Sequence, residues 1–367
     1  LGDYVAGPSH VMPTGGTTGR PKGVMNTHHA NQTCLAHFFM AFTYRDGTRP
    51  VNLAAAPMTH TSGLMSLPCT AQGGKVVVLT KPEPRLLIEA IVAHRVTELF
   101  LPPTVIYSLL ETPGIEEVDF SSLRYLIYGA APMSVEKLKK AIALWGSVMC
   151  ETYGQCEAMG SISNLRPDEH LDGGVLASDE RLSSVGRPNP LVRVEIMDER
   201  NNILSQGETG EICVRGDLVM KGYYKAPEKT AETIIDGWLH TGDIGHIDAG
   251  GYLHISDRKK DMIISGGFNV YPSAVEQVIW SHPSVQDCAV IGVPDPKWGE
   301  AVKAVVERNA GMQVSAEEII ALCKGRLGSI MAPKSVDFVD QLPRSAVGKV
   351  LKKDLRETYW HNHGKKI

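Results

Sequence analysis

Short apolar runs alternate with amphipathic stretches in the first half of the chain. Residues 75–79, 98–101 and 124–128 have the length and the β-branched, aliphatic or aromatic content of buried strands. Between and after them, residues 84–96 and 134–145 repeat apolar positions with helical spacing. This alternation of strand and helix predicts a largely parallel sheet with helices on its faces.

Two small segments follow strand-like runs directly. They are residues 129–132 (Gly-Ala-Ala-Pro) and residues 153–157 (Tyr-Gly-Gln-Cys-Glu). Ligands of parallel sheets bind in the loops beyond the carboxyl ends of the strands. We therefore expect both segments at a ligand-binding edge.

The pattern changes after about residue 185. Short strands at 192–197, 210–215 and 251–255 stand among Gly, Asn and Asp turns, which predicts a small β subdomain over 185–259. No internal repeat or low-complexity tract interrupts the chain.

Residues 260–367 have the pattern of a compact α+β module. Ser273 with Glu276, and Ser315 with Glu318, each have the spacing of a capping box ahead of apolar helical positions. Two strands are expected between these helices, at 287–293 and 301–307.

Composition narrows the class of protein. The 367 residues are 43% hydrophobic and 21% charged, with a formal net charge of -4 and a pI near 6.4. This balance gives no reason to expect nucleic acid as a partner, and no apolar stretch is long enough for a transmembrane segment. The chain begins without a signal-like segment or an initiator Met, so we expect a true N-terminus upstream.

The seven cysteines are scattered and odd in number, and no pair has C-x-x-C spacing. This distribution argues against a disulfide framework or a structural zinc site. It favours buried thiols in a reducing, cytoplasmic environment.

The strongest local signal is the glycine- and threonine-rich segment 14–23. Its glycines let the backbone approach a ligand, its hydroxyls add donors and Lys22 adds charge, so the segment suits a polyphosphate. It is not a Walker A loop, because Arg20 and Pro21 stand before the lysine. A plain surface loop is the alternative that composition leaves open. The candidate ligand-contacting residues are Thr14, Gly16, Thr17, Thr18, Gly19 and Lys22.

This segment resembles the signature loop of the adenylate-forming superfamily, which includes acyl-CoA synthetases, peptide-synthetase adenylation domains and beetle luciferases. Further motifs of that superfamily follow in order at 129–132, 153–157, 210–216, 240–243, 257–261 and 343–349. The resemblance implies an α/β fold in which a large N-terminal domain contains mostly parallel sheets and the small β subdomain. It also implies a small mobile C-terminal α+β domain, with the two domains at 1–259 and 260–367.

The resemblance also implies roles for single residues around ATP. Glu157 matches a catalytic glutamate that binds Mg²⁺, and a hard carboxylate suits that cation. Asp243 matches the carboxylate that holds the ribose hydroxyls, and Arg258 matches a second ribose or phosphate contact. The other residues implied in the nucleotide site are Gly129, Ala130, Ala131, Pro132, Tyr153, Gly154 and Cys156.

Cys156 departs from the superfamily pattern, which usually has Thr at this position. The departure removes a hydroxyl donor that the phosphates would otherwise meet. A reactive thiol is the alternative interpretation of this residue.

Three further positions concern the acid and the second half of the reaction. His60 matches a gate between the carboxylate site and the phosphates, and Lys349 matches the lysine that catalyses adenylation. Lys260 matches the hinge about which the C-terminal domain turns. Gly266 and Gly267 match the segment that lines the pantetheine tunnel of coenzyme A.

These matches together imply ATP-dependent formation of an acyl-adenylate, followed by thioester formation with coenzyme A. Residues 53–65 contain no acidic side chain to pair with an α-ammonium group, so a free amino acid is not the expected substrate. Residues 257–272 look most like fatty-acyl-CoA synthetases, which favours a medium- or long-chain acid.

Several alternatives remain at this level. Aryl-CoA ligases of the coumarate or benzoate type are the nearest, and a nucleotide-binding, non-catalytic fragment is another. A peptide-synthetase module is disfavoured because only 18 residues follow Lys349, and an oxidative, luciferase-like activity has little support. The superfamily's first domain normally begins well before the signature loop, so an upstream part is expected. A homodimer is compatible with the resemblance.

Overall fold

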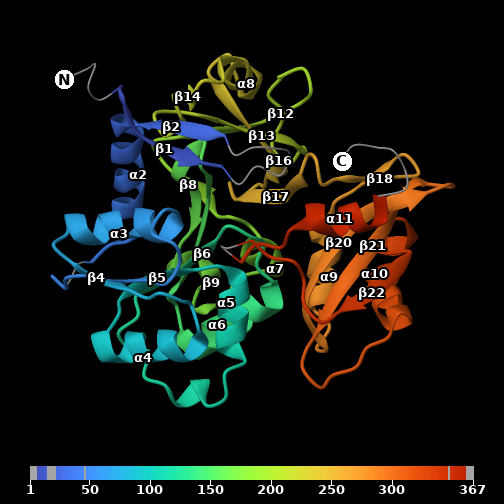
Figure 1. The fold of residues 1–367 in the computed structure, drawn as a ribbon, viewed down its shortest axis with the longest axis horizontal. Helices are drawn as coiled ribbons and strands as arrows, with labels where there is room; N and C mark the ends of the chain where they lie inside the picture. The colour runs from blue at the N-terminus through green and yellow to red at the C-terminus, as the bar shows by residue number, and fades with distance from the viewer. Residues whose placement is uncertain (1–5, 15–21, 45–46, 346–347, 361–367) are drawn as a thin grey trace. The chain divides into compact units, whose positions relative to one another are not determined.

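The computed structural model describes residues 6–14, 22–44, 47–345 and 348–360 (Figure 1). Contacts between Cα atoms divide the chain into two compact units. Unit 1 takes in residues 1–133, 138–241 and 245–255, and unit 2 takes in residues 134–137, 242–244 and 256–367. Each unit is described by itself.

A seven-stranded sheet forms the centre of unit 1. Its order is β11-β8-β7-β6-β5-β3-β4; β3 to β7 pair in parallel, whereas β8 and β11 are antiparallel additions. The prediction of a largely parallel sheet is confirmed. The strands are β3 (Val51–Ala54), β4 (Lys75–Val78), β5 (Glu98–Leu101), β6 (Tyr125–Gly129), β7 (Met149–Gln155), β8 (Ala158–Leu165) and β11 (Arg187–Pro188).

Helices connect the parallel strands and cover both faces of the sheet. The chain steps outward from β3 to β4 and then returns across β3 to β5, so right-handed crossovers place α3 on one face and α4 to α6 on the other (Figure 1). The helices are α2 (His28–Ala41), α3 (Thr61–Ala71), α4 (Pro84–His94), α5 (Pro103–Leu110) and α6 (Val135–Trp145).

Helix α2 packs directly against β8. The close approach depends on Gly160, since a Cβ there would stand 2.2 Å from Cys34 Sγ, and its φ is +86°. The buried His37 places Nδ1 2.9 Å from the Ser161 carbonyl oxygen. The missing side chain at Gly160 and the polar contact between His37 and Ser161 therefore hold α2 against β8.

The two-stranded β9–β10 pair and two larger sheets complete unit 1. One has the order β1-β2-β14, and the other contains β12-β13-β16-β15 with β17 paired to β16. Their strands are β1 (Pro8–Pro13), β2 (Gly23–Thr27), β14 (Gly222–Tyr223), β12 (Arg193–Met197), β13 (Gly210–Arg215), β15 (Ile234–Ile235), β16 (Trp238–Ile247) and β17 (Leu253–Arg258). Shorter elements are η1 (Ile115–Glu117), η2 (Pro167–His170), β9 (Leu171–Asp172), β10 (Val175–Leu176), α7 (Asp179–Leu182) and α8 (Pro227–Thr233).

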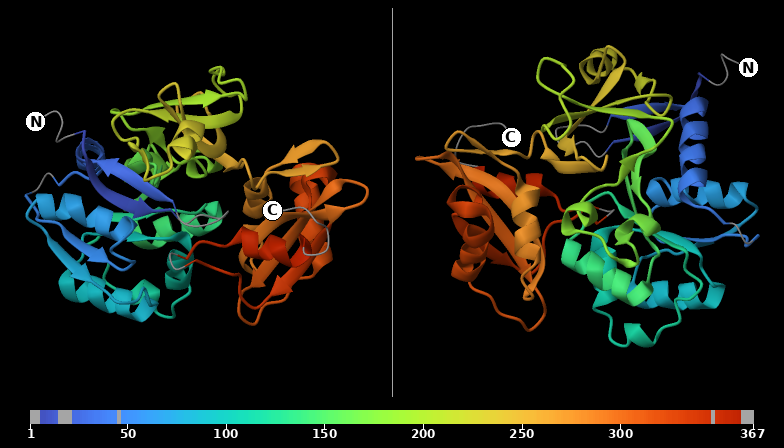
Figure 2. Two further views of the ribbon diagram at one scale, coloured as in Figure 1. Left: turned by 45° about the horizontal axis from the view of Figure 1, so that its top comes forward. Right: turned by 180° about the vertical axis from the view of Figure 1, so that it is seen from behind.

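Unit 2, drawn mainly in orange and red, is built on a five-stranded sheet (Figures 1 and 2). The order is β19-β18-β21-β20, and β22 pairs in parallel with β21. Its elements are β18 (Ile263–Ser265), β19 (Phe268–Val270), α9 (Pro272–Trp280), β20 (Val285–Asp295), β21 (Gly299–Arg308), α10 (Ala316–Met331), β22 (Ser335–Val339) and α11 (Lys352–Trp360).

Alternate residues of β20 enter two different apolar clusters. Cys288 and Val290 pack with residues of α9 and α10, whereas Ala289 and Ile291 pack with Leu342 and with residues of α11. Because side chains of a strand alternate between faces, α11 covers the face opposite to α9 and α10.

Among the described residues, no helix has the length and apolar character needed to cross a membrane.

Only one of the two expected capping boxes forms. Ser315 accepts from the Glu318 amide, and Glu318 Oε2 accepts from the Ser315 amide at 2.7 Å, so the prediction at α10 is confirmed. The predicted capping box at Ser273 does not form, so this prediction was wrong. Helix α9 begins at Pro272 behind the N-cap Tyr271, because proline suits the first helical position.

The two side chains of the failed box have other partners. Ser273 Oγ donates to the Ser256 carbonyl oxygen. Glu276 Oε1 accepts from the Val290 amide at 2.7 Å and lies 2.8 Å from Lys352 Nζ. A charged partner far along the chain thus takes the carboxylate that local spacing assigned to the cap.

Candidate active site

The glycine-rich segment begins at the end of β1 and ends at the start of β2. The Thr14 amide donates to the Lys22 carbonyl oxygen at 2.9 Å, and the Lys22 amide donates to Thr14 Oγ1 at 3.3 Å. These bonds close the base of the loop and hold Lys22 next to β2. The candidates Gly16, Thr17, Thr18 and Gly19 lie outside the described residues.

Glu157 and Lys22 both contact Tyr223, a residue that the sequence did not single out. The Tyr223 hydroxyl donates to Glu157 Oε1 at 2.8 Å, and Lys22 Nζ lies 3.9 Å from the centroid of the Tyr223 ring. A loop cation and a carboxylate thus meet on one buried aromatic side chain. This pair of charges is suited to a polyphosphate and its divalent cation.

The turn after β6 presents bare backbone. A Cβ on Gly129 would stand 2.4 Å from the Thr152 carbonyl oxygen, so only glycine fits against β7 there. Ala130 has φ +66°, an unusual value for a residue with a side chain. Ala130 and Pro132 are exposed and Ala131 is partly exposed. A flat, uncluttered surface of this kind suits a purine, as the resemblance implies.

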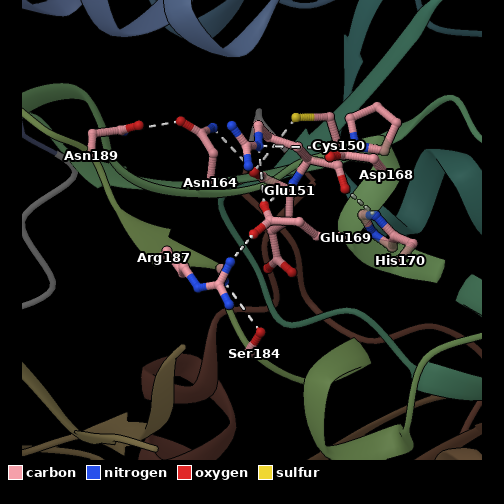
Figure 3. A network of polar contacts seen from close by, with 12 residues as sticks. Cys150, Glu151, Asn164, Asp168, Glu169, His170, Ser184, Arg187 and Asn189 are labelled. Carbon is pink, nitrogen blue, oxygen red and sulfur yellow. Dashed lines mark hydrogen bonds and ion pairs between the residues drawn. The ribbon is translucent and has the colours of Figure 1, made fainter. Parts of the chain in front are cut away.

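A polar network supports strand β7, which contains Tyr153 and Gly154 (Figure 3). Asn164 Nδ2 donates to the Glu151 carbonyl oxygen at 3.2 Å, and Asn189 Nδ2 donates to Asn164 Oδ1 at 2.9 Å. These bonds fix β7 to β8 and β11. They therefore fix the position from which the chain turns towards Glu157.

A second buried polar group includes Tyr128, which directly precedes the turn at residues 129–132. The Glu151 carboxyl accepts a hydrogen bond from Tyr128, whose hydroxyl also lies 3.1 Å from His170 Nε2. Burial raises the pKa of Glu151 to about 8 and lowers the pKa of His170 to about 4. Burial therefore favours the neutral form of each group near neutral pH.

Cys156 is half-buried beside Glu157. Burial and the neighbouring carboxylate of Glu157 raise the pKa of the Cys156 thiol to about 11. A thiol in that state is protonated at neutral pH and is a poor nucleophile. The environment does not support the reactive-thiol interpretation.

His60 occupies the N-cap position of α3, but its side chain makes no capping hydrogen bond. The helix carries Leu64 and Met65 into the same apolar cluster as Tyr153 and Met159. An apolar environment therefore surrounds the region between His60 and the strand that leads to Glu157.

Unit 2 brings together the residues expected at the ribose and at the α-phosphate. Asp243 is buried, and its Oδ1 lies 3.4 Å from Arg258 Nε. Burial, followed by the Arg258 cation, lowers the pKa of Lys349 to about 8, while the carboxylates of Asp243 and Asp261 act in the opposite direction. Lys349, Asp243 and Arg258 therefore share one electrostatic environment.

The loop that carries Lys349 is fixed at its base. The Ser345 amide donates to the Lys349 carbonyl oxygen at 2.8 Å, and the Lys349 amide donates to Ser345 Oγ at 3.2 Å. Arg344 Nη2 lies 2.8 Å from Asp287 Oδ2 and 3.2 Å from Glu307 Oε2. The sequence did not indicate that Arg344 anchors this loop.

Gly266 and Gly267 form the two-residue turn of the β18–β19 hairpin, between the paired residues Ser265 and Phe268. Their φ values are +59° and +83°, so the turn itself requires glycine. A Cβ on Gly266 would also stand 2.5 Å from the Trp298 ring. Lys260 lies in the short connection between β17 and β18, where Arg356 Nη1 donates to its carbonyl oxygen at 3.1 Å.

The chain is similar to known proteins over most of its length. The model of the AMP-binding enzyme family matches residues 7–224, and that of the AMP-binding enzyme C-terminal domain matches residues 274–349. A medium/long-chain-fatty-acid–CoA ligase (FadD8) of Mycobacterium tuberculosis is 39% identical over 361 residues, which cover 96% of this chain and 62% of that protein. A feruloyl-CoA synthase of an Amycolatopsis species is 38% identical over 351 residues, which cover 95% and 69%.

Among solved structures, the amide bond synthetase McbA from Marinactinospora thermotolerans superimposes with a TM-score of 0.88 at 37% identity. The match covers 96% of this chain and 69% of that one. The chain thus spans between three fifths and seven tenths of the length of the proteins it matches.

Proposed function

This chain belongs to the AMP-binding enzyme family, and from that premise we propose that it activates a carboxylic acid with ATP and transfers the acyl group to coenzyme A. The observation that carries the proposal is the convergence of Lys22 and Glu157 on Tyr223. Both charged side chains contact Tyr223 of β14, next to the start of β2, and this supports a polyphosphate site with a divalent cation there. Two relatives are by name a fatty-acid–CoA ligase and a feruloyl-CoA synthase, which supports transfer of an acyl group to coenzyme A.

In the first step, a carboxylate oxygen of the acid attacks the α-phosphorus of ATP, and the bond to pyrophosphate breaks. Lys22 binds the phosphates, and Lys349 neutralises charge between the carboxylate and the α-phosphate. Asp243 and Arg258 hold the ribose, and the backbone of 129–132 lies against the purine. Glu157 would hold a Mg²⁺ ion, which supplies further charge neutralisation on the phosphate oxygens.

The carboxylate of Glu157, together with the phosphates of ATP, suits the coordination that Mg²⁺ prefers. Mg²⁺ keeps several waters and usually takes one or two carboxylates together with substrate phosphates. Glu157 is such a carboxylate, and its orientation is fixed by Tyr223. The described part of the chain has no group of three or more His, Cys, Asp or Glu side chains that would form an all-protein cage.

In the second step, the thiol of coenzyme A attacks the acyl carbon of the adenylate, the thioester forms and AMP leaves. The β18–β19 hairpin offers the turn Gly266-Gly267 beside the partly exposed ring of Trp298. A Cβ on Gly267 would meet nothing within 4 Å, so this position of the turn leaves room for the narrow pantetheine chain.

We propose a medium- or long-chain fatty acid as the substrate. Two observations support this choice: the lack of an acidic side chain in residues 53–65, and the name of the relative with 39% identity. Aromatic acids are the second candidate, since a feruloyl-CoA synthase is 38% identical.

The test is ATP–pyrophosphate exchange by the intact protein with octanoate, palmitate, benzoate, coumarate, ferulate and several amino acids. Exchange that is strongest with the fatty acids supports the proposal, and exchange that is strongest with the aromatic acids selects the second candidate. Exchange with amino acids alone contradicts both. The products formed with coenzyme A and with an added amine then identify the acceptor, because McbA is by name an amide bond synthetase.

A further inference from the structure

Tyr223 occupies the point where two functional segments of unit 1 meet. Its strand β14 pairs with β2 through Tyr223 opposite Val24 and Gly222 opposite Met25. Strand β2 begins at Gly23, directly after Lys22. The sheet register therefore fixes Tyr223 relative to the end of the phosphate-binding loop.

The same segment is also fixed to Glu157. The Met220 amide donates to the Glu157 carbonyl oxygen at 2.8 Å, and the Met159 amide donates to the Leu218 carbonyl oxygen at 3.3 Å. Residues 218–224 thus form a backbone connection between the turn at Glu157 and the strand after Lys22. Tyr223 lies at the end of this connection that is nearer to Lys22.

The side chain of Tyr223 adds one contact to each functional residue. Its hydroxyl donates to Glu157 Oε1 at 2.8 Å, and its ring faces Lys22 Nζ at 3.9 Å from the centroid. Tyr223 is only 4% exposed, and its amide donates to Thr230 Oγ1 at 2.9 Å, so the ring has little freedom to move. A rigid ring can orient both charges, whereas each charged side chain alone has several rotatable bonds.

We propose that Tyr223 is a positioning residue for the adenylation step, which orients Glu157 towards Mg²⁺ through its hydroxyl and Lys22 towards the phosphates through its ring. The inference rests on the proposed function, because it concerns the same ATP site. Carboxylates that bind metals are commonly held by such a hydrogen bond, and the loss of this second contact typically lowers metal affinity 10- to 100-fold. A cation over a tyrosine ring is held by the ring's electrostatic field.

The two contacts can be separated by substitution. Tyr223→Phe removes only the hydroxyl and keeps the ring beneath Lys22. Tyr223→Leu removes both contacts. Tyr224→Phe is the matched control, since Tyr224 is the next residue, is 54% exposed and lies outside the contacts to Glu157 and Lys22.

The experiment measures pyrophosphate exchange against Mg²⁺ concentration, and binding of ATP by calorimetry with and without Mg²⁺. We expect Tyr223→Phe to raise the Mg²⁺ concentration for half-maximal exchange about tenfold, with unchanged ATP binding in the absence of Mg²⁺. Tyr223→Leu should also weaken metal-free ATP binding. Tyr224→Phe should match the wild type, and thermal unfolding should show that all variants are folded.

A double variant tests whether Tyr223 acts through Glu157. In the Glu157→Gln background, Tyr223→Phe should add little to the change in Mg²⁺ dependence, because the two residues form one interaction. Additive effects, or a Mg²⁺ dependence of Tyr223→Phe within twofold of the wild type, would overturn the inference. If none of the tested acids supports pyrophosphate exchange by the wild type, the proposed function fails. The Mg²⁺ dependence of ATP binding measured by calorimetry still decides the role of Tyr223.

Discussion

Cys156 stands beside the glutamate that we expect to bind Mg²⁺, in a position where a threonine is usual. Its thiol is half-buried, and its raised pKa of about 11 keeps it protonated. A protonated thiol is a weak donor that can only partly replace a hydroxyl. We propose that Cys156 is a weaker phosphate contact than the usual threonine.

Cys156→Thr should therefore leave the rate of adenylation unchanged or raise it, with an effect of about 1 kcal/mol or less. The measurement is pyrophosphate exchange at saturating acid, with Cys34→Ser as the thiol control away from the phosphates. A nucleophilic cysteine predicts the opposite result. A loss of about 10³-fold, a size typical of a lost catalytic group, would disprove our interpretation.

Glu151 and His170 make stability depend on pH in opposite directions. Below its folded pKa of about 8, Glu151 is protonated in the folded protein, whereas the unfolded chain ionises near 4.5. Its contribution is complete below pH 4.5 and is lost as the pH rises to 8. His170 is neutral when folded, so its contribution is complete above 6.5 and is lost as the pH falls to about 4.

Between pH 6.5 and 8, of these two groups only Glu151 makes the stability depend on pH. The free energy of unfolding should fall there by up to about 1.4 kcal/mol per pH unit from this group. Glu151→Gln should remove that part of the slope, whereas Glu116→Gln, at an exposed position, should not. Urea unfolding at three pH values measures both. Equal slopes in the wild type and Glu151→Gln would show that Glu151 ionises normally in the fold.

At the scale of single elements, two helices of unit 2 begin in different ways. Helix α10 begins with a reciprocal cap between Ser315 and Glu318, whereas α9 begins at Pro272. Local spacing was identical at both sites, yet Glu276 of α9 pairs with Lys352 of α11. Spacing alone therefore predicts the cap only where no stronger partner competes for the carboxylate.

Ser315→Ala should cost about 1 kcal/mol of stability, because the Glu318 amide loses its acceptor at the helix start. Ser315→Asn should retain most of the stability, since asparagine caps equally well. Hydrogen exchange at residues 316–319 locates the effect at the first turn. Unchanged protection in Ser315→Ala would mean that packing of Ile319 and Cys323 alone holds this turn.

At the scale of the whole molecule, the proposed reaction has two steps that use different loops of unit 2. Lys349 lies in the loop anchored by Arg344, and Gly266-Gly267 lie in the β18–β19 hairpin. We propose that the two loops serve the ATP site in turn, by rotation at Lys260. Hinges of this kind are a few residues at the boundary of an element, which describes the connection between β17 and β18.

Lys349→Ala should then lower adenylate formation roughly 10²- to 10³-fold and leave thioester formation from a supplied acyl-adenylate largely intact. Lys260→Pro should do the reverse, because proline fixes φ at the pivot. Lys260→Ala controls for the loss of the side chain. Pyrophosphate exchange and thioester formation from synthetic adenylate measure the two steps separately. Equal loss of both steps in both folded variants contradicts rotation at this position.

The sequence alone determined the features that depend on local periodicity and residue type. The parallel strands were predicted because buried strands and amphipathic helices each have a periodic signature, and β5 and β13 have the expected bounds. The order of the motifs likewise predicted the family. These features can be predicted from the sequence because each depends on residues that are near neighbours in the chain.

Only the tertiary structure decided which residues meet across long distances in the sequence. Tyr223 reaches Glu157 over 66 residues, and Arg344 reaches Asp287 over 57. No spacing rule predicts such pairs, because sheet register and helix packing bring them together. The expected cap at Ser273 fails for the same reason, since Glu276 accepts from the Val290 amide and pairs with Lys352, both far along the chain.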